Sequence, residues 1–180
     1  MSPPAERVLG WRIWRLRDRS LHSLVIDYRW VPGENRAACM PFERAPCSQS
    51  PGQHCNCGFW AAWSPRQALS RTCATVEPPW QVLGLVAMSG AVVGHGADGL
   101  RAERATLRCL CADRPWAWLP PVDESGWGDE LRSVAADYDV PLLSLSNAES
   151  LRLSEESGPH NFLSTTQARP VIGAAGRAAR

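Results

Sequence analysis

Apolar and polar residues alternate through the first part of the chain in the manner of β-strands. Val8 to Leu16 predicts a strand in which the apolar phase slips by one residue between Ile13 and Trp14, as a β-bulge would cause. Arg17 to Ser20 is a polar turn, after which Leu21 to Ile26 becomes apolar again. The pattern predicts an N-terminal β-hairpin.

The most apolar part of the chain lies in its centre, and Ser89-Gly90 interrupts it. We expect two strands, Val82–Met88 and Ala91–His95, with Ser89-Gly90 as the two-residue turn of a hairpin. A second turn at Gly96–Gly99 leads into a third strand, Leu100–Leu110. This antiparallel meander and the N-terminal hairpin together predict a small antiparallel sheet or partial barrel.

Three segments have the pattern of helices. Ser64 followed by Pro65 is a helix start, and the first helix is expected to run to Thr72. Asp129–Tyr138 has apolar residues at the three-four spacing of a buried helix face. A third helix, Ala148–Glu155, would be capped by Asn147, after a short buried strand at Val140–Leu145.

The length and the pattern together predict one domain. A chain of 180 residues has room for one ordinary domain and a tail. We assign residues 1–156 to a single α+β domain with a Cys-rich loop at 39–58. Residues 157–180 lack apolar periodicity, and we expect them to form a disordered tail.

The composition narrows the class of protein. All the basic side chains other than histidine are arginine, which indicates a high-G+C, bacterial genome. A net charge of +1 argues against a protein that coats nucleic acid by charge alone. The N-terminus has no apolar signal segment, and the longest apolar run, Val82 to Val93, is too short to span a bilayer. We therefore expect a cytoplasmic protein that does not enter a membrane.

The candidate chemistry lies in the Cys-rich loop, where Cys39, Cys47, Cys55 and Cys57 follow the spacing Cys-x7-Cys-x7-Cys-x-Cys. Four thiols this close together in a loop rich in Pro, Ser, Gln and Gly match no helix or strand face. Thiolates are preferred zinc ligands, and thiols stay reduced in the cytoplasm. The spacing predicts a structural zinc site with these four ligands, and His54 is a substitute for Cys39 or Cys47.

Two other interpretations of these cysteines remain open. Cysteine packs well as a small hydrophobic residue, so the four could be unrelated packing residues. Cys55 and Cys57 could instead form a redox pair. The chain offers no Cys-x-x-Cys at a helix start, where a thiolate would be stabilised, and this weakens the redox interpretation.

The remaining cysteines favour packing. Cys109 and Cys111 are two residues apart, so in a strand both thiols would point to the same face. Burial is favoured over a second metal site, because cysteine is among the most buried residue types. Cys73 is assigned to the core for the same reason.

The sequence contains no enzyme signature. It has no phosphate-binding glycine loop, no Gly-x-Ser-x-Gly elbow and no His-Glu-x-x-His. His95 lies at a hairpin end, where a histidine is more commonly satisfied or solvent-exposed than functional, and the acidic residues near Asp129 suit a helix start. We therefore favour a non-enzymatic binding or accessory module with a protein partner.

The alternative function is nucleic-acid binding, through arginines interleaved with tryptophans near the N-terminus. Such a mixture can hold phosphates and stack on bases. The residues concerned are Trp11, Arg12, Trp14, Arg15, Arg17 and Arg19.

Several motifs together resemble small uncharacterised proteins of actinobacteria, including copies on mobile elements. The motifs are Gly-Trp-Arg-x-Trp, Cys…Ala-Pro…Cys-x-Cys-Gly, a Gly- and Val-rich segment ending in Arg-Ala-Glu, and Leu-x-x-Ala-x-x-Tyr-x-Val-Pro-Leu. They cover Gly10–Trp14, Cys39–Ala61, Gly84–Glu103 and Leu131–Leu142, within about three quarters of the chain. The resemblance supports the α+β fold and the metal site, and implies no activity.

The chain departs from these proteins at one position. A histidine commonly precedes Ala-Pro in them, whereas Glu43-Arg44 precede Ala45-Pro46 here and Cys47 follows directly. If that histidine is a ligand in the family, Cys47 replaces it in this chain.

Overall fold

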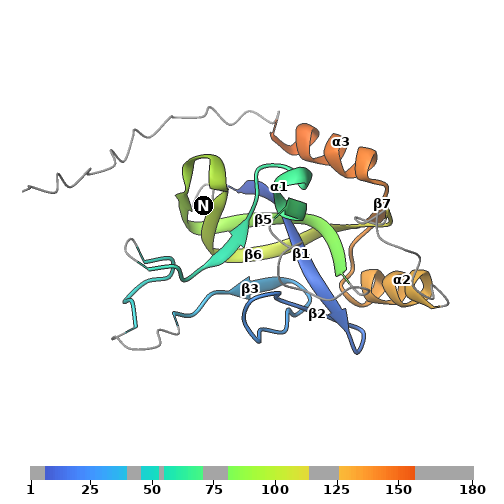
Figure 1. Cartoon of the computed structure of the whole chain (residues 1–180), viewed down its shortest axis with the longest axis horizontal. Coiled ribbons are helices and arrows are strands. Elements are labelled where there is room, and N and C mark those ends of the chain that lie inside the picture. Colours follow the sequence, from blue (N-terminus) through green and yellow to red (C-terminus); the bar gives the residue numbers. More distant parts are fainter. Residues whose placement is uncertain (1–6, 40–45, 53–54, 71–80, 114–125, 157–180) are drawn as a thin grey trace, which may run out of the picture.

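The fold is α+β, with a seven-stranded, mostly antiparallel sheet and three α-helices. A computed structural model describes residues 7–39, 46–52, 55–70, 81–113 and 126–156. The central strands follow the order β2-β1-β5-β6-β3, while β4 and β7 also pair with β6 (Figure 1). The strands are β1 Val8–Arg17, β2 Ser20–His22, β3 Glu34–Arg36, β4 Phe59–Ala61, β5 Gln81–Gly94, β6 Leu100–Cys111 and β7 Leu142–Leu143.

The sheet closes on itself through the segment that follows the Cys-rich loop. β4 pairs with β6, and Ala62, the residue after β4, exchanges two backbone hydrogen bonds of 2.7 and 2.8 Å with Trp11 of β1. β1 also pairs with β5, and β5 pairs with β6. These four strands therefore close into a small barrel, in which β4 is a strand that the sequence pattern did not predict.

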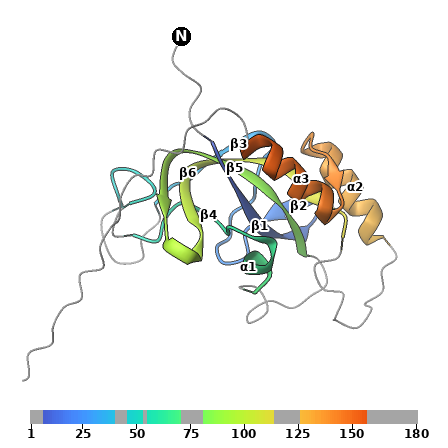
Figure 2. The same cartoon turned by 90° about the horizontal axis from the view of Figure 1, so that it is seen from above.

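Both faces of the barrel wall are covered. Trp14 of β1 belongs to a core cluster shared with α2 (Trp127–Asp137), while Trp11 belongs to a second cluster shared with α1 (Pro65–Ser70) and α3 (Leu145–Glu156). α2, β7 and α3 lie at the end of the molecule opposite the Cys-rich loop (Figure 2). None of the helices in the described part of the chain has the length and apolar content needed to span a membrane.

The predicted β-bulge in the first strand is wrong. β1 pairs with β5 in unbroken register from Val8↔Met88 to Arg15↔Gln81. The apolar phase slips because side chains on both faces are buried, Trp11 on one face and Trp14 on the other. A strand buried on both faces does not alternate between apolar and polar residues, so a change in that alternation is no evidence of a bulge.

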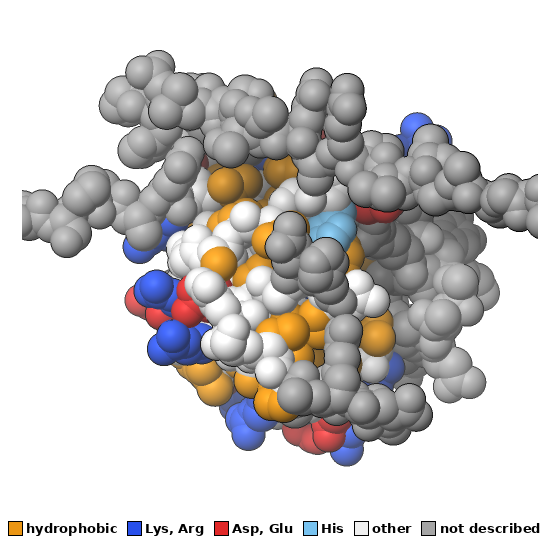
Figure 3. All heavy atoms as spheres, turned by 90° about the vertical axis from the view of Figure 1, so that its left-hand side faces the viewer, with side chains coloured by type: hydrophobic (Ala, Val, Ile, Leu, Met, Phe, Trp, Pro, Cys, Tyr) orange, Lys and Arg blue, Asp and Glu red, His pale blue; other side chains and the backbone are white. Residues whose placement is uncertain are grey.

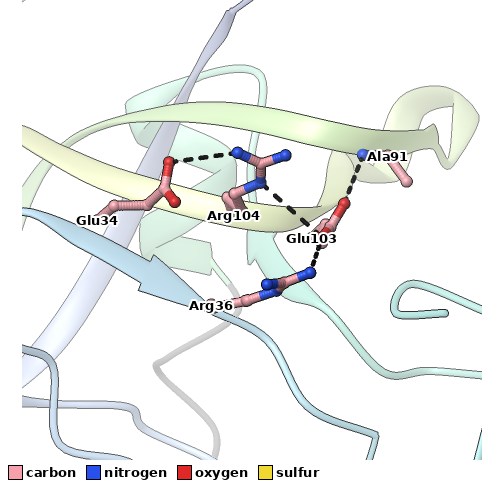
Figure 4. Close-up of polar contacts among 5 residues, drawn as sticks. All are labelled: Glu34, Arg36, Ala91, Glu103 and Arg104. Carbon is pink, nitrogen blue, oxygen red and sulfur yellow. Dashed lines mark hydrogen bonds and ion pairs between the residues drawn. The ribbon is translucent and has the colours of Figure 1, made fainter. Parts of the chain in front are cut away.

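The predicted hairpin turn at Ser89-Gly90 is also wrong. β5 runs through it to Gly94, and the register with β6 shifts between Ser89 and Val92, as at a β-bulge. Glu103 of β6 holds this bulge, since its carboxylate accepts a hydrogen bond of 3.3 Å from the N–H of Ala91 (Figure 4). The meander therefore has two long strands, β5 and β6, joined by the predicted turn at Gly96–Gly99.

The helices match their predictions, with small differences at their ends. Ser64 caps α1 by accepting a hydrogen bond from the N–H of Gln67, as predicted. α3 begins at Leu145, three residues earlier than expected, and its cap is Ser144 rather than Asn147. The expected strand before it is the short β7, which pairs with β6 in parallel. Thr72, Cys73 and the predicted tail at 157–180 lie outside the described residues.

Candidate metal centre

Strands on both sides of the Cys-rich loop fix its two ends to β6. Cys39 follows β3, which pairs with β6 at Arg104–Thr106. Cys57 precedes β4, which pairs with the same strand at Leu100–Ala102. The first and last of the four cysteines are therefore carried to one end of the barrel by neighbouring segments of a single strand.

The structure brings the four predicted ligands together. The Sγ atoms of Cys39, Cys47, Cys55 and Cys57 all lie within 4.8 Å of one another, and the Sγ atoms of Cys39 and Cys55 are 3.7 Å apart. Four sulfurs around a zinc ion, each at about 2.3 Å, are about 3.8 Å from one another. The cluster could therefore hold a metal ion such as zinc. His54 lies outside the described residues.

The backbone of the loop turns closely around the thiols. The N–H of Gly52 donates a hydrogen bond of 3.1 Å to Sγ of Cys57, and the N–H of Cys55 donates to the carbonyl of Gly52. A Cβ atom at position 52 would overlap Sγ of Cys47 and lie 3.3 Å from Cβ of Cys55. The close approach of this backbone to two thiols requires glycine at position 52.

Hydrogen bonds within the cluster shift the pKa values of Cys47 and Cys55 in opposite directions. A hydrogen bond from the backbone of Cys57 is the main cause that lowers the pKa of Cys55 to about 6. The pKa of Cys47 is raised to about 12, chiefly by its hydrogen bond with the Cys39 thiol. The opposite pKa shifts reflect how closely the thiols of the cluster contact one another.

The sequence pattern did not identify Arg101 as a residue of the site. Arg101 belongs to β6, and its side chain contacts the backbone of the Cys-rich loop. Its guanidinium donates hydrogen bonds to the carbonyl oxygens of Cys55 and Cys57, the latter at 2.8 Å. The side chain is nearly fully buried against Trp60. Arg101 reaches the loop because β4, which follows the loop, pairs with β6. The residues around Arg101 in the sequence do not predict this pairing.

The described side chains at the end of the molecule that carries the loop include few charged groups near its centre (Figure 3). Where described side chains are visible on this face, the centre is mainly hydrophobic or neutral and the charged groups lie toward its rim (Figure 3). The four cysteines are themselves half-buried. A metal ion held by them would be within reach of solvent and chelators.

Cys109 and Cys111 are buried together, as predicted. Both belong to the core cluster shared with α1 and α3. Burial raises the pKa of each thiol, that of Cys111 to about 12. Protonated, buried thiols of this kind pack as small apolar side chains. Among the described residues, the only group of three or more potential metal ligands is that of the four loop cysteines.

The predicted nucleic-acid-binding residues do not form one surface. Trp11 and Trp14 are 1% and 0% exposed, so their indoles cannot stack on bases. Arg12 is held inside, against the carbonyl of Trp60, the hydroxyl of Ser23 and the ring of Trp30, and desolvation lowers its pKa to about 10. The three that remain exposed are Arg15, Arg17 and Arg19.

Comparisons with protein-family models, curated proteins and solved structures give no match to this chain. The resemblance to actinobacterial proteins therefore stays a prediction.

Proposed function

We propose that the protein is a non-enzymatic binding or accessory module whose Cys-rich loop is held by a structural zinc ion. The convergence of four cysteine sulfurs within 4.8 Å carries this proposal. A zinc ion with four thiolate ligands from the protein has no open position for water or substrate, which is the property that separates structural from catalytic zinc sites. Zinc would join the segment after β3 to the segment before β4.

Metal content and thermal melting test the zinc site. We expect about one zinc per chain in protein purified without added metal, and a lower melting temperature after chelation, because metal binding stabilises only the folded form. Cys55→Ser should reduce the zinc content, whereas Cys109→Ser, which changes a thiol of the core, should retain it. Metal-free protein that melts at the same temperature with and without added zinc would contradict the proposal.

Exposed apolar side chains support a binding role. The loop between β2 and β3 is ordered by backbone hydrogen bonds between Ser23 and Tyr28 and between Leu21 and Trp30. It nevertheless exposes Val25, at 94%, and Ile26. These two adjacent apolar side chains are the candidate contact with another protein. Partners retained by the wild type and lost by a Val25→Asp/Ile26→Asp variant of unchanged stability would identify that surface as the contact.

Nucleic-acid binding would rely on exposed arginines alone. Retention on DNA or RNA that declines with salt, and that weakens in an Arg15→Gln/Arg17→Gln variant, would support this alternative. Absence of binding at low salt would exclude it.

A further inference from the structure

Arg101 is a charged side chain in an environment that should not favour one. The residue is 1% exposed, and a buried guanidinium is destabilising unless its charge and its N–H groups are matched. Its hydrogen bonds run to the two cysteine carbonyls and to Nε2 of His95, the last at 2.5 Å. Within the described ranges, no carboxylate forms an ion pair with it.

The four thiols above Arg101 are the groups that could match its charge. Four thiolates around one divalent zinc ion carry a net charge of −2. The guanidinium is bonded to the backbone of Cys55 and Cys57, two of these four residues. In the metal-bound protein the buried cation would therefore lie next to an anionic centre, and each would stabilise the other.

The same contacts fix the position of the ligands. A guanidinium holds several acceptors in one plane, so one side chain can fix both carbonyls of the Cys55–Cys57 segment. Arg101 is itself held by His95 and by the ring of Trp60, which lies 5.2 Å from its central carbon. Trp60 pairs with Arg101 across β4 and β6, so the support extends into the barrel wall.

We propose that Arg101 is a positioning residue of the metal centre, holding the Cys55–Cys57 segment in place and offsetting the charge of the thiolates. This inference rests on the proposed zinc site. According to this inference, the rate of zinc release is controlled in part by a barrel residue that is distant in sequence from all four ligands.

The test compares three variants of the full chain. Arg101→Met removes the charge and the hydrogen bonds, whereas Arg101→Lys retains the charge and loses the planar fork. Arg108→Met is the matched control, because Arg108 lies on the same strand and its ion pair with Glu155 of α3 is far from the loop. The readouts are the rate of zinc transfer to an excess of a chromophoric chelator and the sulfur-to-cobalt charge-transfer band of the Co²⁺-substituted proteins.

Arg101→Met should release zinc about tenfold faster than wild type, in the range known for outer-shell partners of metal ligands. Its cobalt band should move to longer wavelength, because thiolates that lose a nearby positive charge give up electrons more easily. Arg101→Lys should also release zinc faster, while its band stays near that of wild type. Arg108→Met should match wild type in both.

Release from Arg101→Met at the wild-type rate, or equally fast release from Arg108→Met, would overturn the inference. If Arg101→Met does not fold, Arg101→Lys decides the question, and an unchanged release rate in that variant overturns the positioning role. A wild-type protein that binds no zinc would instead contradict the proposed function. The two failures are therefore distinguishable.

Discussion

Gly52 controls the spacing of the thiols, because its backbone passes between Cys47 and Cys55. A methyl group there would overlap the sulfur of Cys47. We expect Gly52→Ala to lower the zinc affinity about tenfold or more, since thiols that move apart lose the geometry the ion requires. Competition with a chelator of known affinity measures the change.

Gly94→Ala is the control for that substitution. It adds the same methyl group on β5, where the new Cβ would have no atom of the described residues within 4 Å apart from its chain neighbours. Its zinc affinity should equal that of wild type. Equal affinities in the two variants would show that the loop can rearrange around an added methyl group.

Tyr138 joins the end of α2 to the loop that follows β2. Its hydroxyl donates a hydrogen bond of 2.7 Å to the carbonyl of Trp30 and accepts one from the N–H of Leu21. Tyr138→Phe leaves both buried backbone groups without that partner and should lower the free energy of unfolding by about 1–3 kcal/mol. Urea denaturation measures the loss.

Tyr28→Phe provides the comparison. The Tyr28 hydroxyl makes a longer bond, 3.3 Å, to Oδ1 of Asn35, which also accepts from the N–H of Val31. Its removal should therefore destabilise the protein less than Tyr138→Phe. A larger loss at Tyr28 would show that the Tyr138 bonds are replaced by solvent.

At the scale of elements, Glu103 holds the β5 bulge and the edge strand β3 in place. Besides the N–H of Ala91, its carboxylate contacts Arg36 of β3 at 3.0 Å (Figure 4). The N–H of Ala91, followed by Arg104 and Arg36, lowers the pKa of Glu103. A lowered pKa means that the ionised form stabilises the fold above the unfolded-state pKa and that this contribution disappears as pH falls through the folded-state value.

Glu103→Gln should therefore melt at a lower temperature than wild type at pH 7, and the difference should shrink as the pH falls below the ordinary range of a glutamate, about 4. Melting curves of both proteins at several pH values measure the difference. Glu34→Gln, at an exposed ion pair of 3.8 Å with Arg104, should show little difference at any pH. A Glu103 difference that is independent of pH would contradict this account.

The sequence predicts a helix or strand best where the residues of that element alone carry the signal. The apolar face of α2 and the Ser64 cap of α1 are local signals, and the structure confirms both helices. The Ser89-Gly90 prediction failed because the feature that makes this site a bulge, the side chain of Glu103, lies on the partner strand. The spacing of the cysteines was enough to predict the four candidate ligands. The contact of Arg101 with the loop depends on the pairing of β4 with β6, which no local pattern in the sequence predicts.

At the scale of the molecule, the barrel core and the Cys-rich loop are stabilised by different interactions. The two core clusters are built from the strands and helices, and the loop is held by thiols and by Arg101. Chelation at room temperature should therefore increase amide exchange at Gly52 and Cys55, and leave the amides of Trp11 and Ala62 protected. Hydrogen exchange with and without a chelator measures both sets. Loss of protection at all four would show that the barrel itself needs the metal.

The order of the strands in the chain has a consequence for folding during synthesis. β1, β3 and β4 all pair with β5 or β6, the two strands encoded after them. A ribosome that has made the N-terminal hairpin and all four loop cysteines has not yet made the strand that gathers the loop. Pairing between such distant segments is slow to form. We therefore expect the loop to reach its final geometry only after β6 emerges, so that stable metal binding would be a late event in the biogenesis of this protein.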